Sequence, residues 1–237
     1  MTKIFKKYKS YIDNAIPAYF SDEKFIECFG RVPKFRYETM TYCWDHVIKH
    51  NLKTIVELGT SRSFVDGRFD GCNSSDVHYW QPDNPEVWDW SAGCFTRVIG
   101  ELIQGTDIEL VTLDLQQEHI NRSMKMTENL KNIEYYVSSS EEFLNSVDGQ
   151  IDFLYMDTGD VNPVEPTAIL HLQESKILVE NNLISDNGII LIDDVRNPSS
   201  KLSCDADYGK AKYSIPYLQE NGFTIAMDEY QVVMIKS

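Results

Sequence analysis

The 237-residue sequence lacks the usual marks of secreted, membrane-spanning and nucleic-acid-binding proteins. Its five cysteines are widely spaced and never form a C-x-x-C pair, so neither a disulfide framework nor a zinc knuckle is indicated. No stretch approaches the ~20 apolar residues of a membrane span. Lys and Arg number 22 against 37 Asp and Glu, and the net charge of −15 repels phosphate backbones and anionic lipids. These absences favour a cytoplasmic protein that binds neither nucleic acid nor membranes.

The composition is that of a chain with a large core. Apolar residues make up 42% of the sequence, and there are only 12 Gly and 8 Pro, so a disordered chain is excluded. Residues 1–51 are predicted as an N-terminal helical extension in which Ser21 is an N-cap. One helical stripe of this extension consists of Met40, Cys43, Trp44, Val47 and Ile48.

After residue 52, short β-branched runs alternate with helical patterns. These runs are residues 54–58, 108–113, 133–137, 151–156, 188–192, 223–227 and 230–235. The alternation predicts an α/β fold with a doubly wound, Rossmann-like, seven-stranded sheet over residues 52–237. Most strands should be parallel, but only Asp228 and Glu229 separate the last two runs, so the final strand should be antiparallel.

One connection is anomalously long. An aromatic insertion at residues 64–91 follows the first strand, where 2–6 residues are usual. Its aromatic content argues against a solvated linker.

Ligands of such sheets bind beyond the carboxyl ends of the strands. The candidate residues there are Glu57, Gly59, Thr60 and Ser61 after the first strand, Asp114 after the second, Ser139, Ser140 and Glu141 after the third, Asp157 after the fourth, and Asp193 and Asp194 after the fifth. Gly59 allows close approach to a ligand, and Asp114 can accept both hydroxyls of a ribose, which implies a nucleoside-type ligand. An ordinary strand-end turn is the alternative, because a single glycine turn is a weak signal.

The aspartates form a sharper pattern. If the fourth and fifth strands are adjacent, Asp157, Asp193 and Asp194 come close enough to share one ion. Oxygen ligands of this kind suit Mg²⁺, and also Mn²⁺ or Ca²⁺. No Lys or Arg flanks Asp157 to offer a local salt bridge. Solvated aspartates that cap the next helices are the alternative.

In this order, the motifs resemble class I S-adenosylmethionine-dependent methyltransferases, in particular metal-dependent O-methyltransferases of the macrolide-sugar and catechol type. The resemblance covers residues 52–236 and lies in "TIVELGTSRS", "VTLDL", "VSSSEEF", "FLYMD" and "LIDDV". It implies S-adenosylmethionine bound by Glu57, Gly59, Thr60, Ser61, Asp114, Ser139, Ser140, Glu141 and Asp157, and a divalent cation bound by Asp157, Asp193 and Asp194.

The resemblance further implies methyl transfer to a hydroxyl of a small acceptor. Thr158 stands where catechol-type enzymes carry a lysine base, so the likeness shifts to the sugar enzymes and to a sugar or glycan diol as acceptor. Asp157, or with less support Asp160, would accept the proton. Chelation would then abolish activity. In the insertion, His78, Trp80, Trp88 and Trp90 are candidate acceptor contacts, and a structural flap, or an interface in a homo-oligomer, is the alternative.

Three other readings compete. A metal-dependent glycosyltransferase is suggested by the pair Asp205 and Asp207. A non-catalytic domain that binds a nucleoside or a protein partner is the second. A nicotinamide oxidoreductase is disfavoured, because the G-x-G-x-x-G spacing is missing.

Overall fold

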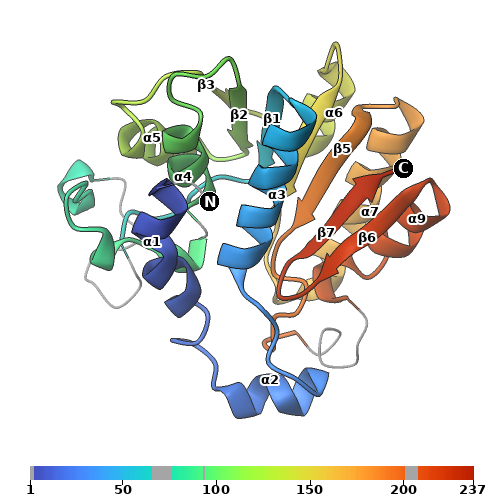
Figure 1. Cartoon of the computed structure of the whole chain (residues 1–237), viewed down its shortest axis with the longest axis horizontal. Helices are drawn as coiled ribbons and strands as arrows, with labels where there is room; N and C mark the ends of the chain where they lie inside the picture. Colours follow the sequence, from blue (N-terminus) through green and yellow to red (C-terminus); the bar gives the residue numbers. More distant parts are fainter. Residues whose placement is uncertain (1–2, 66–75, 93, 201–207) are drawn as a thin grey trace.

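The computed structural model describes residues 3–65, 76–92, 94–200 and 208–237. The described strands form one seven-stranded sheet in the order β3-β2-β1-β4-β5-β7-β6 (Figure 1). The strands are β1 (Thr54–Leu58), β2 (Glu109–Asp114), β3 (Ile133–Val137), β4 (Ile151–Met156), β5 (Ile184–Ile192), β6 (Phe223–Asp228) and β7 (Val232–Lys236). The first five are parallel, and β7 lies antiparallel between β5 and β6. The predicted α/β fold and antiparallel last strand are confirmed.

Helices cover both faces of the sheet because alternate strand residues point to opposite sides. In β4, Phe153 and Tyr155 belong to one core cluster, whereas Leu154 and Met156 belong to the other. The first cluster lies under α1 (Lys3–Asn14), α3 (Arg36–His50) and α4 (Phe95–Leu102), next to α5 (Gln117–Met126). The second lies under α6 (Ser140–Ser146), α7 (Val164–Glu180) and α9 (Ser214–Glu220). Burial on both faces explains the continuous apolar runs.

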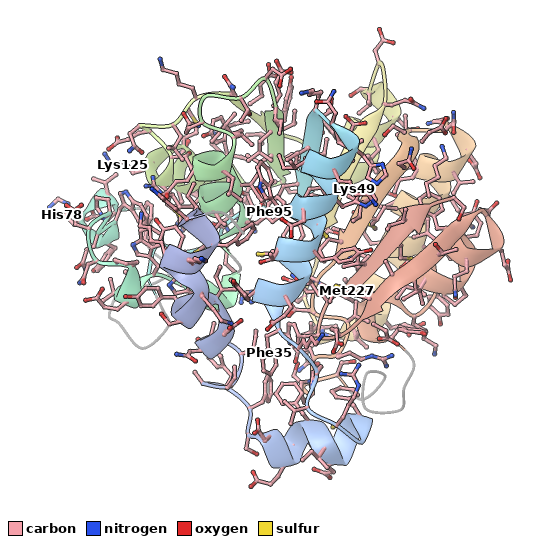
Figure 2. The ribbon with its side chains drawn as sticks, in the orientation of Figure 1. Phe35, Lys49, His78, Phe95, Lys125 and Met227 are labelled. Atoms are coloured by element: carbon pink, nitrogen blue, oxygen red, sulfur yellow. The ribbon has the colours of Figure 1, made fainter. Side chains whose placement is uncertain are left out.

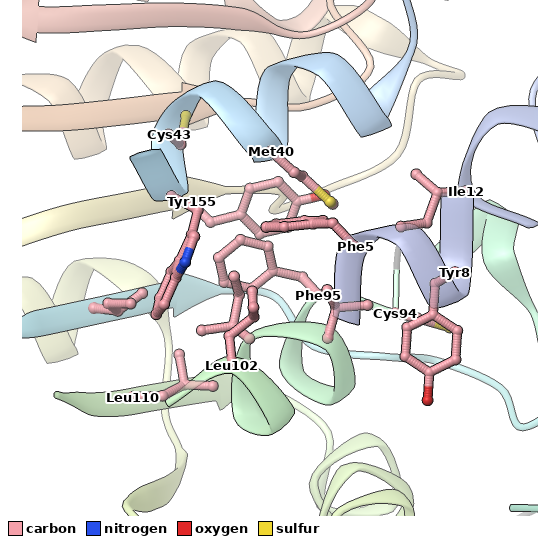
Figure 3. Packing of buried hydrophobic residues seen from close by; sticks show 14 of the residues in the cluster. Phe5, Tyr8, Ile12, Met40, Cys43, Cys94, Phe95, Leu102, Leu110 and Tyr155 are labelled. Atoms are coloured by element: carbon pink, nitrogen blue, oxygen red, sulfur yellow. The ribbon is translucent and has the colours of Figure 1, made fainter. Parts of the chain in front are cut away.

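The N-terminal helices are part of this helical layer. Helix α3 packs on β4, β5 and β7, and α1 packs on α3 and α4. Figure 3 shows Phe5 of α1 and Met40 of α3 beside Phe95 and Tyr155 in the resulting core. Phe95 and Tyr155 stack with ring centroids 4.1 Å apart. Of the predicted stripe on α3, four members are buried, whereas Ile48 is exposed.

Helix α2 (Asp22–Phe29) is the most peripheral helix and lies at one end of the molecule in Figure 1. It begins as predicted, with the Ser21 side chain accepting a hydrogen bond from the backbone N–H of Lys24. Its Phe25 packs against Phe35 and Tyr230. Cys28 in this helix is disulfide-bonded, which the cysteine pattern did not predict. Within the described residues, no helix is long and apolar enough to cross a membrane.

The described part of the aromatic insertion forms short turns η1 (Val77–Tyr79), η2 (Pro85–Val87) and η3 (Trp90–Ala92), of which η2 and, through Trp90, η3 pack on α1. Trp88 and Trp90 stack with ring centroids 5.5 Å apart, and both contact Tyr8. Their indole N–H groups donate to the backbone oxygens of Gln81 and Pro85. The tryptophans therefore join the insertion to the core.

Candidate functional site

A cavity of about 850 Å³ opens at the carboxyl ends of the parallel strands. Its walls come from the loops after β1, β2, β3 and β4, and from the segment between α1 and α2. This is the edge at which open α/β sheets bind ligands.

Gly59 forms the floor where the ends of β1 and β4 meet. Its φ angle of +85° lies in the left-handed region, and a Cβ atom built there would stand 2.8 Å from the backbone oxygen of Asp157. The N–H of Asp157 in turn donates to the Leu58 oxygen at 3.0 Å. A side chain at position 59 would force the two strand ends apart. Glycine therefore keeps the backbone open to a ligand.

Asp114 projects from the end of β2 into the same cavity. Its Oδ1 accepts from the backbone N–H of Gln116 at 2.9 Å, and its Oδ2 lies 3.4 Å from the N–H of Thr60. These bonds fix the carboxylate between the first two strand ends. Each carboxylate oxygen keeps capacity to accept further hydrogen bonds.

The structure brings most of the predicted cofactor-binding residues to the cavity wall. Those in the wall are Gly59, Thr60, Asp114, Ser139, Ser140, Glu141 and Asp157. Ser139 also caps α6, accepting from the N–H of Glu142 at 3.1 Å. Ser61 and Glu57 are buried away from the cavity, with 2% of each residue exposed.

Glu57 has a structural position inside the fold. Its Oε2 accepts hydrogen bonds from the hydroxyls of Thr112 at 2.6 Å and Thr96 at 2.5 Å, which joins β1 to β2 and α4. Burial raises the pKa of Glu57 to about 8, although both threonine bonds oppose the shift. The folded chain therefore holds a proton on Glu57 at neutral pH.

The stability of the chain should fall as the pH rises because of Glu57. In the unfolded chain this carboxyl has a pKa near 4.5, and in the folded chain its pKa is about 8. Between these values the folded state binds more protons, so each pH unit costs at most about 1.4 kcal/mol of unfolding free energy. Urea unfolding of wild type and Glu57→Gln at pH 5, 7 and 9 measures the difference. We expect the free energy of unfolding of Glu57→Gln, relative to that of wild type, to increase with pH. A difference independent of pH would contradict the assignment.

The three predicted metal ligands lie together at the ends of β4 and β5. Oxygen atoms of Asp157, Asp193 and Asp194 lie within 4.8 Å of one another. The expected adjacency of the two strands produces this cluster, because Met156 pairs with Ile192 in the sheet register.

Asp193 is saturated by donors from the protein. Arg36, at the start of α3, donates to Oδ2 from Nη2 at 2.7 Å and from Nε at 3.0 Å. Tyr155 donates to the same oxygen, and Gln231 donates to Oδ1 at 3.0 Å. The charge of Arg36 lowers the pKa of Asp193 despite complete burial. No lone pair of this carboxylate remains directed at an ion.

Asp157 and Asp194 share the ammonium group of Lys210. Lys210 lies in the turn η4 (Gly209–Ala211), and its Nζ is 2.7 Å from Oδ1 of Asp157 and 3.8 Å from Oδ2 of Asp194. Tyr230 donates a hydrogen bond to Oδ1 of Asp194. No Lys or Arg flanks Asp157 in the sequence, so the cationic partners of these aspartates are not local. The partners come from distant parts of the chain.

The arrangement does not fit a divalent ion held by all three aspartates. Asp193 is filled by Arg36, Tyr155 and Gln231, and the Lys210 ammonium stands between the other two carboxylates. Three negative and two positive charges also leave little charge for an ion to neutralise. Asp160, the second predicted base, lies farther out, with its side chain 76% exposed and 3.4 Å from Arg62.

The predicted acceptor contacts from the insertion do not reach the cavity wall. His78 lies at the periphery of the molecule with its side chain 85% exposed (Figure 2). Trp80, Trp88 and Trp90 belong to the core. From the insertion, Asp89 and Ser91 line the cavity, and Ile16, Tyr19, Phe20 and Tyr230 also belong to its wall.

Arg36, Lys210 and Tyr230 also belong to this site, although the sequence does not predict them there. No local motif marks them, because each meets the aspartates only through the fold. The single available signal is the need of three clustered carboxylates for counter-charges.

No protein-family model matches the sequence, and neither does any curated protein. Solved structures do resemble it. The S-adenosylhomocysteine-bound methyltransferase PaMTH1 of Podospora anserina aligns over 100% of this chain and 88% of its own, with a TM-score of 0.53 and 14% identity. An O-methyltransferase of Bacillus cereus in complex with S-adenosylhomocysteine aligns over 98% of this chain and 100% of its own, with a TM-score of 0.51 and 12% identity. The N-methyltransferase NodS of Bradyrhizobium japonicum, also in complex with S-adenosylhomocysteine, aligns over 99% of this chain and 99% of its own, with a TM-score of 0.51 and 12% identity. The chain has the fold of these S-adenosylmethionine-dependent methyltransferases.

Proposed function

We propose that this protein transfers a methyl group from S-adenosylmethionine to a hydroxyl of a small acceptor, a sugar or glycan diol. The observation that carries the proposal is the pairing of the open Gly59 backbone with the Asp114 carboxylate in one cavity of a methyltransferase fold. Solved structures of this fold contain S-adenosylhomocysteine, the product of that donor.

The donor is proposed to bind along the strand ends. Asp114 accepts the two ribose hydroxyls, the backbone at Gly59 and Thr60 contacts the methionine part, and Ser139, Ser140 and Glu141 face the adenine. The acidic wall suits a positively charged sulfonium.

In the proposed reaction the methyl carbon leaves the sulfur and bonds to the acceptor oxygen. The sulfur keeps the electron pair of the broken bond, and S-adenosylhomocysteine forms. The hydroxyl proton passes to the Asp157 carboxylate, which lies in the cavity wall. Burial raises the pKa of Asp157, which strengthens this carboxylate as a base.

The acceptor is proposed to bind between the N-terminal segment and the strand ends. Tyr19, Phe20 and Tyr230 line this part of the cavity. Aromatic faces of this kind stack on the C–H surfaces of sugars, while Asn197 and Asp194 beside them can bind hydroxyls. The competing outcome is methyl transfer to a nitrogen of the acceptor. An assay with matched alcohol and amine acceptors would distinguish the two.

A glycosyltransferase and a non-catalytic binding domain are the alternatives to this methyltransferase. The Asp205 and Asp207 pair that suggested a glycosyltransferase lies outside the described residues. A domain that only binds S-adenosylmethionine, or a protein partner, would show binding without turnover. A divalent cation held by Asp157, Asp193 and Asp194 stays a prediction of the sequence, and the ion pairs of these aspartates weigh against it.

The experiment that tests the proposal is the affinity of an Asp114→Ala variant for S-adenosylhomocysteine. Loss of two charge-assisted hydrogen bonds, each worth about 1.5–3 kcal/mol, should weaken binding by at least about 100-fold, as measured by titration calorimetry. Glu109→Ala is the matched control, because Glu109 is an exposed acid at the opposite end of the same strand. Unchanged affinity of Asp114→Ala, or no binding to wild type, would refute the proposed donor site.

A further inference from the structure

We propose that the cation of this site is built into the chain: the Lys210 ammonium occupies the place among Asp157, Asp193 and Asp194 that a divalent ion would take, so that methyl transfer needs no metal. The inference rests on the proposed function for its catalytic part. Its structural part, the exclusion of a metal by Lys210, can be tested on the protein alone.

Burial of the ammonium is the first observation. The Lys210 side chain is fully buried, and its Nζ lies 2.7 Å from Asp157 and 3.8 Å from Asp194. An unpaired buried ammonium is rare because desolvation is costly. Here the two carboxylates that the ammonium contacts offset this cost.

Saturation of the cluster is the second observation. Arg36 and Lys210 together supply two positive charges to three carboxylates, and Arg36 is as deeply buried as Asp193. A divalent ion in this space would lie against the fixed ammonium, and like charges at such distances repel strongly. It would also have to displace the donors that already fill Asp193.

The geometry gives Lys210 a positioning function. Within the described part of the chain, the side chain of Asp157 accepts one hydrogen bond, from Lys210 to Oδ1. Oδ2 is left to accept a proton from the acceptor hydroxyl. Lys210 does not line the cavity, so it acts through Asp157.

The test measures Mn²⁺ binding and methyl transfer in wild type, Lys210→Met and Lys212→Met. Lys212 is the matched control, a lysine two residues away that lies 5.3 Å from the Tyr213 ring. In wild type we expect electron paramagnetic resonance to detect no tight Mn²⁺ binding. Exhaustive chelation should change the rate of methyl transfer by less than about twofold. The Lys212→Met variant should behave like wild type.

In Lys210→Met the site should change its properties. Removal of the ammonium leaves Asp157 without its ion-pair partner and Asp194 with Arg36 alone, so we expect the variant to acquire Mn²⁺ binding. Without added metal, the kcat of Lys210→Met should fall about 100-fold, while its affinity for S-adenosylhomocysteine stays within about threefold of the wild-type value. Addition of Mn²⁺ or Mg²⁺ should raise the kcat of the variant by at least about 10-fold. A merely structural lysine would show no such rescue.

Tight Mn²⁺ binding by wild type, or wild-type activity that chelation removes and Mn²⁺ restores, would overturn the inference. These wild-type measurements decide the question even if Lys210→Met does not fold. Calorimetry with S-adenosylhomocysteine separates the two claims: absence of binding refutes the proposed function, whereas metal binding by an otherwise competent protein refutes only the role of Lys210.

Discussion

Asp157→Asn is expected to lower kcat for methyl transfer by about 1,000-fold, because a general base contributes about 10²–10⁴-fold and an amide cannot accept the proton. Asparagine has nearly the same shape and can keep a polar contact with Lys210, which now bonds Oδ1 of Asp157 at 2.7 Å. The affinity for S-adenosylhomocysteine should therefore change little. Steady-state kinetics with a radiolabelled methyl donor, together with calorimetry, measures both quantities.

Asp160→Asn is the control for this variant. Asp160 lies on the same loop and also lines the cavity, but its side chain is mostly exposed and near Arg62. We expect its kcat to fall less than about 10-fold. A larger loss in Asp160→Asn than in Asp157→Asn would transfer the role of base to Asp160, and full activity of Asp157→Asn would remove Asp157 from the mechanism.

Gly59→Ala is expected to weaken binding of S-adenosylhomocysteine by at least about 100-fold, because a shift of the strand ends misplaces every backbone contact proposed for the donor. The added Cβ would stand 2.8 Å from the backbone oxygen of Asp157, and backbone at this position cannot move without separating β1 from β4. Calorimetry measures the affinity, and thermal unfolding reports the accompanying loss of stability.

Gly105→Ala separates backbone strain from the loss of the cavity floor. Gly105 has a φ angle of +76°, close to that of Gly59, but a Cβ there would have nothing within 4 Å. Both variants carry the left-handed strain of about 1–2 kcal/mol. Only Gly59→Ala should lose affinity for the ligand. Equal affinities in the two variants would show that the donor does not bind over Gly59.

Much of the fold follows from local patterns in the sequence. The run at residues 151–156 is apolar at nearly every position because β4 is covered on both faces, and the short link at residues 229–231 forces β6 and β7 to be antiparallel. The carboxyl ends of parallel strands meet at one edge, so the convergence of Asp157, Asp193 and Asp194 could also be predicted.

The partners of these residues could not be predicted, because they depend on contacts between distant segments. Arg36 precedes Asp193 by 157 positions, and Lys210 follows Asp157 by 53. No periodicity or spacing encodes such pairs. The orientation of Glu57 was inaccessible for a related reason, since hydrogen bonds from Thr96 and Thr112 turn it into the fold.

The aromatic insertion shows a different limit. Its composition indicates burial but does not identify the surface that it buries. The tryptophans pack on Tyr8 and Tyr11 of α1, and residues of the segment between α1 and α2, among them Tyr19 and Phe20, take their place at the cavity.

A crystal structure of the protein grown with S-adenosylhomocysteine tests the donor site most directly. We expect density for the ligand in the cavity, with the ribose hydroxyls on the Asp114 carboxylate and the homocysteine over Gly59. Ligand density elsewhere on the molecule, or an empty cavity at saturating ligand concentration, would contradict it.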